Sequence, residues 1–254
     1  MTSDRPVVII TGASRGIGAA CARALSPKAN LVLAARSDLV LESTANECSA
    51  QGAQVKTVVG DVARNETACA LADRAQEAFG RIDAVIANAG ILTPFGSLES
   101  CDAQAIEYAL AVNIVGPTLL ARATLPALRA SKGRLINVSS GAGNGVIRGW
   151  ATYCAAKAAL NHLTRVIAAD VPEVTAIAFS PGMTDTDMQA QIRDQGDKGM
   201  PSEELSFFQR TYAEGGLRDA DEVGKGLAAL ALFAKKEWSG EYIDIADPRI
   251  AALG

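Results

Sequence analysis

The chain has 254 residues, of which 49% are hydrophobic and 20% are charged, so it can bury a sizeable core and does not have the composition of a disordered protein. Its formal net charge of -4 argues against a nucleic-acid partner and against binding to anionic membrane surfaces. A single histidine, and five cysteines without C-x-x-C spacing, exclude a histidine-rich metal site, and we expect no metal.

The N-terminal segment, residues 1–6, is polar and charged and has no apolar core of a secretory signal. The longest apolar stretches are broken by Asn113 and Pro117 or bounded by Lys225 and Lys235, so we expect no membrane-spanning segment. The odd number of cysteines is typical of reduced thiols. Together these features predict a cytoplasmic protein.

Short apolar runs, rich in β-branched residues, alternate along the chain with longer segments of helical spacing. The predicted strands are residues 7–11, 31–35, 55–59, 84–87, 134–138, 174–179 and 242–245. The predicted helices are residues 18–25, 39–50, 66–79, 103–128, 151–169 and 221–233. Asp38 and Asp102 are predicted N-caps, and Asp221 is predicted in a helical first turn.

The predicted strands read as apolar throughout, which is typical of a parallel sheet covered on both faces. Their alternation with helices predicts an α/β fold, a doubly wound parallel sheet (Rossmann fold) of about seven strands with helices on both faces. We expect residues 1–254 to form a single domain. The polar stretch at residues 185–217 follows the sixth predicted strand, at the edge where such sheets bind ligands, and we predict that it is a substrate lid.

A glycine-rich segment, Thr-Gly-Ala-Ser-Arg-Gly-Ile-Gly at residues 11–18, joins the first predicted strand to the first predicted helix. Glycines permit a tight turn and close backbone approach to a pyrophosphate, and the helix N-terminus supplies N–H donors. An ordinary strand-to-helix turn is the alternative, but the position after an N-terminal strand favours a dinucleotide site. The candidate contacts are Gly12, Ser14, Arg15, Gly16, Ile17 and Gly18.

The end of the second predicted strand indicates which dinucleotide is bound. Its residues Ala34-Ala35-Arg36-Ser37 include no acid to accept from the ribose 2′-hydroxyl of NAD. Arg15 and Arg36 can instead make charge-assisted contacts with a 2′-phosphate, which would favour NADPH by about ten- to a thousand-fold. The sequence therefore predicts NADP(H), unless Arg36 is only a solvated surface residue.

A tyrosine and a lysine lie four residues apart, at Tyr153 and Lys157, on one face of a predicted helix. A nearby ammonium stabilises a phenolate and lowers its pKa from about 10, so the tyrosine could exchange a proton with a substrate oxygen. The pair alone is weak evidence, because a core tyrosine beside a surface lysine has the same spacing. Ser140 lies thirteen residues before Tyr153, just after the fifth predicted strand, where its hydroxyl can face the same pocket.

The glycine spacing G-x-x-x-G-x-G, together with these residues, resembles the short-chain dehydrogenase/reductase family over nearly the whole chain. The resemblance implies that Asp61 and Val62 complete the adenine side of the cofactor site, and that the Asn88-Ala89-Gly90 element follows the fourth strand. It also implies a segment that holds the nicotinamide carboxamide and pyrophosphate, with the contacts Pro181, Gly182, Thr184 and Thr186.

The same resemblance assigns the catalytic roles. It implies that Ser140, rather than Ser139, orients the substrate carbonyl, that Tyr153 donates the proton and that Lys157 holds the nicotinamide ribose. Asn113 matches the family's asparagine that supports a water in a proton relay; a helix kink or a packing role is the alternative reading. Both Tyr153 and Lys157 are therefore expected to contact the cofactor as well.

The C-terminal run, residues 239–248, is similar to the sepiapterin reductases and benzil reductases, in which an Asp at the place of Asp247 can anchor a substrate amine. An Asp-Pro turn is the alternative. Ser140, Trp150, Met183 and Asp247 are thus the candidate substrate contacts. Further pocket closure is expected from Phe95, residues 142–150, Met188, Phe207, Phe208 and Tyr212, which favours a bulky apolar or aromatic carbonyl compound over a sugar phosphate.

These features predict an NADPH-dependent carbonyl reductase that reduces a ketone or diketone. An NADP+-dependent alcohol dehydrogenase, a 3-ketoacyl reductase and a non-catalytic NADP(H) sensor stay open as alternatives. The resemblance also implies a homodimer or homotetramer, assembled through the predicted helices at 103–128 and 151–169.

Overall fold

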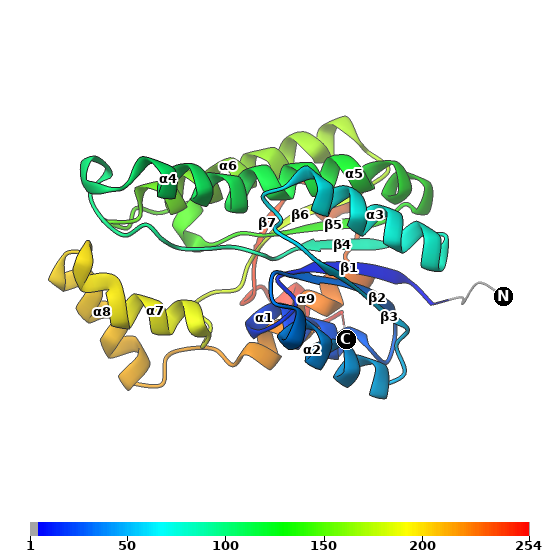
Figure 1. Cartoon of the computed structure of the whole chain (residues 1–254), viewed down its shortest axis with the longest axis horizontal. Helices are drawn as coiled ribbons and strands as arrows, with labels where there is room; N and C mark the ends of the chain where they lie inside the picture. The colour runs from blue at the N-terminus through cyan, green and yellow to red at the C-terminus, as the bar shows by residue number, and fades with distance from the viewer. Residues whose placement is uncertain (1–4, 254) are drawn as a thin grey trace.

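The computed structural model describes residues 5–253; residues 1–4, which form most of the segment read for a secretory signal, lie outside the described part. In this part the strands form one parallel sheet in the order β3-β2-β1-β4-β5-β6-β7 (Figure 1). Their bounds are β1 Val7–Thr11, β2 Asn30–Ala35, β3 Val55–Val59, β4 Ala84–Ala87, β5 Arg134–Val138, β6 Thr175–Ser180 and β7 Tyr242–Asp244. The order reverses between β1 and β4, which is where a doubly wound sheet opens a crevice for a ligand.

Helices cover both faces of the sheet, as the predicted doubly wound fold requires. Figure 1 shows α3, α4, α5 and α6 on one face and α1, α2 and α9 on the other. The helices are α1 Gly16–Leu25, α2 Asp38–Ala50, α3 Asn65–Phe79, α4 Ala103–Leu110, α5 Gly116–Ser131, α6 Ala151–Asp170, α7 Asp187–Gln195, α8 Ser202–Ala213, α9 Ala220–Phe233 and α10 Pro248–Ala251. The predicted seven strands and five of the six predicted helices are thus confirmed to within a few residues at their ends, and the sixth, at residues 103–128, is divided.

The alternating side chains of each strand divide between two hydrophobic clusters, one on each face of the sheet. On β1, Ile10 packs toward α1 and α9, and Ile9 packs toward α3 and α5. Both are fully buried, and each such side chain contributes about 1.5–3 kcal/mol by leaving water. The β3 strand is the exception, since Val59 is half exposed at the sheet edge.

The helix predicted at residues 103–128 is interrupted. A π-helical segment, Ala111–Val115, separates α4 from α5, and the N–H of Gly116 donates to the carbonyl of Ala111. Pro117, which follows at once, has no N–H to donate to the carbonyl four residues earlier. The break places Asn113 in the π-helical segment, which is a common location of functional residues.

The whole helical stretch Ala103–Ser131 is long and apolar enough to cross a membrane by length and composition alone, and 44% of its most apolar window is buried inside the fold. A core helix of a soluble protein passes the same test. Leu120, Ala121 and Leu128 of this stretch belong to the cluster on one face of the sheet, so its apolar side already has a partner within the chain.

The predicted helix starts have different outcomes. Asp102 caps α4, with its carboxylate accepting from Ala105 N at 2.9 Å. The prediction for Asp38 is wrong, because the cap position is Ser37 and Asp38 is the first helical residue. Asp221 does lie in the first turn of α9, where Asp219 is the cap.

Candidate active site

A cavity of about 290 Å³ runs along the carboxyl ends of the central strands. Fifteen of the predicted cofactor and catalytic residues line it: Gly12, Ser14, Arg15, Gly16, Ile17, Arg36, Asp61, Val62, Asn88, Ala89, Gly90, Tyr153, Lys157, Pro181 and Thr186. These residues come from six stretches of sequence: the segments that follow β1, β2, β3, β4 and β6, and helix α6.

The glycine-rich segment forms one end of this cavity. Gly12 has φ +66°, a left-handed conformation that favours glycine. A Cβ on Gly18 would lie 2.2 Å from the carbonyl oxygen of Gly12, so only glycine lets α1 start this close to the loop. Gly18 therefore does not line the cavity itself, but permits the close packing of α1 against the loop that does.

The N-terminus of α1 opens into the same space. Arg15 occupies its cap position and makes no side-chain cap hydrogen bond, so side chains leave the first-turn N–H groups of α1 uncapped. Uncapped N–H groups and the positive end of the helix dipole suit a pyrophosphate. With Arg15 and Arg36 in the lining, the residues present fit a phosphorylated dinucleotide.

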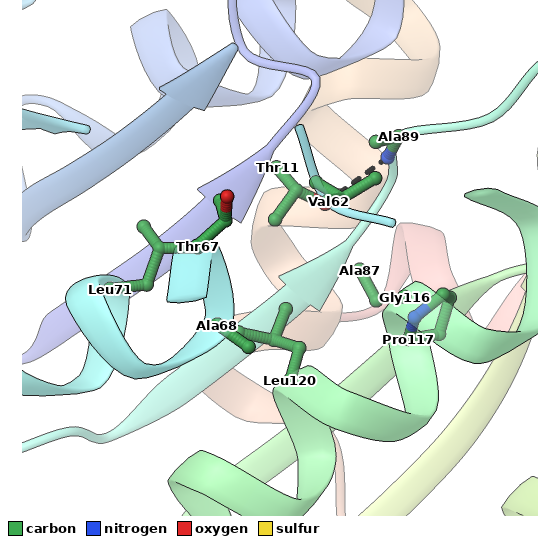
Figure 2. Close-up of a pocket in the computed structure, with 10 residues that line it drawn as sticks. All are labelled: Thr11, Val62, Thr67, Ala68, Leu71, Ala87, Ala89, Gly116, Pro117 and Leu120. Atoms are coloured by element: carbon green, nitrogen blue, oxygen red, sulfur yellow. Dashed lines mark hydrogen bonds between the residues drawn. The ribbon is translucent and has the colours of Figure 1, made fainter. Parts of the chain in front are cut away.

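Thr11 fixes the Asn88-Ala89-Gly90 element against β1. Its hydroxyl accepts from the N–H groups of Asn88 and Ala89, both at 3.1 Å, and the second of these bonds is drawn in Figure 2. The Asn88 amide in turn donates to the Thr11 and Gly12 carbonyls at 2.9 and 3.2 Å. Behind this clamp, Figure 2 shows apolar side chains of α3 and α5, including Leu71 and Leu120. The sequence analysis did not give Thr11 this role.

Arg36 and Asp61 lie close together in the lining of the cavity, joined by Tyr108 of α4. The Arg36 guanidinium donates to the Tyr108 hydroxyl at 3.2 Å, and that hydroxyl donates to an Asp61 carboxylate oxygen at 3.0 Å. Arg15 makes a different contact, a 2.7 Å ion pair with Asp187 at the start of α7. The predicted basic end of the cavity is thus formed, with Tyr108 and Asp187 as members that the sequence analysis missed.

Tyr153 and Lys157 lie side by side on α6, both buried, and the Lys157 Nζ is 5.5 Å from the centre of the Tyr153 ring. The ammonium donates to the Val138 carbonyl at 2.8 Å. Burial raises the pKa of Tyr153 to about 12, against the opposing effect of a hydrogen bond with Ser140. Burial also lowers the pKa of Lys157 to about 8. The predicted direction for the pKa of Tyr153 is therefore wrong for this protein without cofactor, because burial is the largest cause of the shift.

The lowered pKa of Lys157 has a measurable effect on stability. Lysine in an unfolded chain has a pKa of about 10.4, so between about pH 8 and 10 the unfolded chain binds more protons than the folded protein. The free energy of unfolding should therefore rise with pH across this window. In urea titrations without cofactor we expect Lys157→Met to lose this rise; an equal slope in both proteins would contradict it.

The two adjacent serines after β5 point to different partners. The Ser139 hydroxyl donates to the Asn161 amide oxygen at 2.5 Å, and the Asn161 amide nitrogen donates to Asn144 at 3.1 Å. Ser140 instead shares a hydrogen bond with Tyr153 and accepts from Ala142 N at 3.2 Å. This placement supports Ser140 as the serine beside the tyrosine, and Asn161 is a residue that the sequence analysis missed.

Asn161→Ala would leave the buried Ser139 hydroxyl without its acceptor. An unsatisfied buried polar group costs about 1–3 kcal/mol, so we expect the free energy of unfolding in urea to fall by about 2 kcal/mol. His162→Ala changes the exposed neighbour on the same helix and should stay within about 0.5 kcal/mol. Equal effects of the two substitutions would show that the Ser139–Asn161 bond contributes no stability.

Asn113 is fully buried in the π-helical segment and lies behind the cavity wall. Its amide nitrogen donates to the Ile91 carbonyl at 2.7 Å and to the Ala109 carbonyl at 3.0 Å, and its amide oxygen accepts from Ile91 N at 3.2 Å. Asn113 therefore fastens the helix break to the loop after β4. This role matches the helix-kink alternative that the sequence left open for Asn113. Asn113 is also near the lysine: a Cβ built on Gly90 would lie 3.0 Å from the Asn113 amide oxygen and 3.6 Å from the Lys157 Nζ.

The segment after β6 closes the cavity with Pro181 and Thr186. Gly182 has φ +66°, and the Thr184 hydroxyl donates to the Pro181 carbonyl at 3.0 Å. Gly182 and Thr184 thus shape the turn that presents Pro181 and Thr186.

An aromatic cluster lies beyond Tyr153, on the side expected for substrate. Trp150 contacts the edge of Tyr153 with 5.9 Å between ring centres and stacks on Phe208 of α8 at 5.2 Å. Met183 packs against the same cluster. Phe207 and Tyr212, however, are about half exposed, so the prediction that they close the pocket is wrong.

Asp247 lies away from this cluster, at the start of α10. Its carboxylate accepts from Arg249 N at 2.9 Å and pairs with the Arg249 guanidinium at 2.8 Å. It is not among the residues that line the cavity. The prediction that Asp247 contacts the substrate is therefore not supported. Asp247 instead forms a turn, the alternative reading, and caps α10.

Residues 185–217 form α7 and α8, which project beside the carboxyl edge of the sheet (Figure 1). Arg148, in the loop before α6, holds α8 through a 2.6 Å ion pair with Glu204 and a backbone bond to the same carboxylate at 3.0 Å. Asp187 and Met188 of α7 line the cavity. Within residues 5–253, no group of three or more His, Cys, Asp or Glu side chains is placed to hold a metal ion.

Comparison with known proteins places the chain in a family. The model of the family described as short chain dehydrogenase matches residues 6–197. An uncharacterized oxidoreductase of Schizosaccharomyces pombe is 33% identical and covers 94% of this chain and 95% of its own. The benzil reductase of Saccharomyces cerevisiae is 32% identical (97% and 98% covered), and the sepiapterin reductase of Rattus norvegicus is 33% identical (95% and 96%). The chain belongs to the short-chain dehydrogenase/reductase family of oxidoreductases.

Solved structures agree in fold and differ in cofactor. The KRED1-Pglu enzyme superposes with a TM-score of 0.89 at 35% identity, covering 94% of this chain and 100% of its own. A 3-oxoacyl-[acyl-carrier protein] reductase of Brucella melitensis in complex with NAD has a TM-score of 0.82 at 26% identity, with 96% of each chain covered. An alcohol dehydrogenase of Thermococcus sibiricus, complexed with 5-hydroxy-NADP, has a TM-score of 0.80 at 30% identity (95% and 96%). The fold therefore binds nicotinamide cofactors of both kinds.

Proposed function

We propose that this protein is an NADPH-dependent carbonyl reductase that reduces a ketone or diketone. The observation that carries the proposal is that Tyr153 and Lys157 line one cavity with Arg15 and Arg36, and that Ser140 lies beside Tyr153. The proton donor and the basic cofactor end are thus parts of one continuous site. The similarity to benzil and sepiapterin reductases supports the same reaction class.

When bound, the nicotinamide would supply hydride to the carbonyl carbon. The Tyr153 hydroxyl donates its proton to the oxygen as negative charge develops there. Ser140, which already shares a hydrogen bond with Tyr153, orients that oxygen and adds a second donor. The raised pKa of Tyr153 keeps the phenol protonated near neutral pH, which is the form that carbonyl reduction requires.

Lys157 and Asn113 have supporting roles in this proposal. Lys157 would donate to the ribose hydroxyls of the cofactor, and its ammonium would favour the phenolate that remains after proton transfer. Asn113 holds the Ile91 backbone, which keeps the loop after β4 in place beside Lys157. The lowered pKa of Lys157 means that a fraction of it is neutral in mildly alkaline solution before cofactor binds.

The preference for NADPH is proposed from charge. Arg36 follows β2 at the position where NAD-binding proteins carry an acid, and Arg15 lines the same cavity. A 2′-phosphate would receive charge-assisted hydrogen bonds from guanidinium groups at this place.

The substrate class is proposed from the cluster beyond Tyr153. Trp150, Phe208 and Met183 are apolar, which favours an aromatic or bulky apolar carbonyl compound over a sugar phosphate. Residues 185–217 would act as the lid, since α7 lines the cavity and α8 carries Phe208.

The proposal is tested by following the absorbance of the reduced nicotinamide with NADPH and with NADH. A panel of benzil, sepiapterin, other diketones, quinones and acetoacetyl thioesters would sample the substrate classes. We expect turnover with NADPH and an aromatic diketone among the best substrates. NADPH binding without turnover over the whole panel would favour the non-catalytic sensor, and a best substrate among the thioesters would favour the 3-ketoacyl reductase.

A further inference from the structure

The contact between Arg36 and Tyr108 suggests a determinant of cofactor choice that does not touch the catalytic residues. Arg36 follows β2, Asp61 follows β3, and Tyr108 lies on α4. The fold alone brings these three residues together. All three line the cavity. The Tyr108 hydroxyl uses its single proton toward Asp61 and its lone pair toward Arg36.

We propose that Tyr108 is a specificity-determining residue, which holds the Arg36 guanidinium in place for the 2′-phosphate of NADPH and keeps it from pairing directly with Asp61. The inference rests on the proposed NADPH-dependent function and deepens it. Its basis is the hydrogen-bonded chain Arg36–Tyr108–Asp61, in which the tyrosine separates a cation from an anion.

The separation matters because a cation paired with a carboxylate is less available to a phosphate. Asp61 is fixed on its other oxygen, which accepts from Ala63 N at 3.0 Å, so its carboxylate stays beside Arg36. Without the Tyr108 hydroxyl, the flexible Arg36 side chain could swing onto Asp61 and lose its orientation. Restoring it on binding would then cost side-chain entropy and the broken ion pair, which weakens the complex.

NADH lacks the 2′-phosphate, so its affinity should not depend on the position of the Arg36 guanidinium. Tyr108→Phe removes the hydrogen bond that orients the charged Arg36 guanidinium, so we expect it to raise the Kd of NADPH about tenfold. The Kd of NADH should change by less than about twofold. The phenyl ring is retained, so the shape of the cavity wall is preserved.

The experiment measures Kd of NADPH and NADH by isothermal titration calorimetry for the wild type, Tyr108→Phe, Arg36→Gln and the double variant. Once Arg36 is absent, Tyr108→Phe should change the Kd of NADPH by less than about twofold, because its effect acts through Arg36. Tyr212→Phe serves as the matched control, since Tyr212 also contacts a guanidinium, that of Arg193, but lies outside the cavity lining.

An equal rise of both Kd values, or an undiminished effect of Tyr108→Phe in the Arg36→Gln background, would overturn the inference and leave the proposed function standing. Equal wild-type Kd values for NADPH and NADH would overturn the proposed cofactor and this inference together. A selective, Arg36-dependent loss of NADPH affinity would support both.

Discussion

Tyr153→Phe is expected to lower kcat/KM for carbonyl reduction by about 10²–10⁴, the range that general acid catalysis supplies. The substitution removes only the hydroxyl, which would donate the proton to the substrate oxygen. The ring contact with Trp150 is kept, so the buried cluster should stay packed. Initial rates with the best substrate of the carbonyl panel measure the effect.

The Kd of NADPH separates a chemical defect from a binding defect. We expect it to change by less than about threefold in Tyr153→Phe, because the basic end of the cavity is untouched. Tyr212→Phe removes a hydroxyl from the exposed face of α8 and should keep full activity. A Tyr153→Phe protein with wild-type kcat/KM would exclude Tyr153 as the proton donor.

Arg36→Asp is expected to reverse the cofactor preference. It removes a guanidinium from beside the 2′-phosphate and places a carboxylate there, which repels the phosphate and can accept from the 2′-hydroxyl of NADH. The ratio of kcat/KM for NADPH to that for NADH should fall by at least about a hundredfold. The measurement is the pair of kcat/KM values at saturating carbonyl substrate.

Arg74→Asp provides the matched control, because it makes the same change of charge on the exposed face of α3, outside the cavity lining. Its ratio of kcat/KM for NADPH to that for NADH should stay within about twofold of the wild type, since salt screens an exposed charge that lies outside the cavity. An Arg36→Asp protein that still prefers NADPH would defeat the assignment of Arg36 to the 2′-phosphate.

The fold could be predicted because local patterns decide it. Fully apolar runs such as Val7–Thr11 can only be buried on both faces, and their alternation with helices leaves few topologies. The helix break at Ala111–Val115 was predicted only as the alternative reading of Asn113, because the apolar residues around it continue the helical pattern through Pro117. Such a break depends on a backbone hydrogen bond and leaves no periodic signal.

The site was predictable where a motif has fixed spacing and less so where side chains meet across the fold. The glycine loop and the Tyr153–Lys157 pair are local in sequence. Tyr108 and Asn161 were missed because their partners are Arg36 and Ser139, far away along the chain. Asp247 was assigned to the substrate because the sequence could not place the start of α10 relative to the cavity.

The direction of the pKa shift of Tyr153 was also beyond the sequence. Spacing indicated that Lys157 would be near, and it is. The balance between that charge and burial depends on how completely α6 is covered, and in the folded protein burial dominates for both residues.

The most direct test of carbonyl reduction by this site uses NADPH deuterated at the transferred position of the nicotinamide. After turnover of the best panel substrate, mass spectrometry and NMR of the alcohol locate the label. We predict deuterium on the carbinol carbon with wild-type protein, and at least about a hundredfold less labelled alcohol with Tyr153→Phe over the same reaction time. Cofactor oxidation without label on that carbon, or equal labelling by both proteins, would contradict the account.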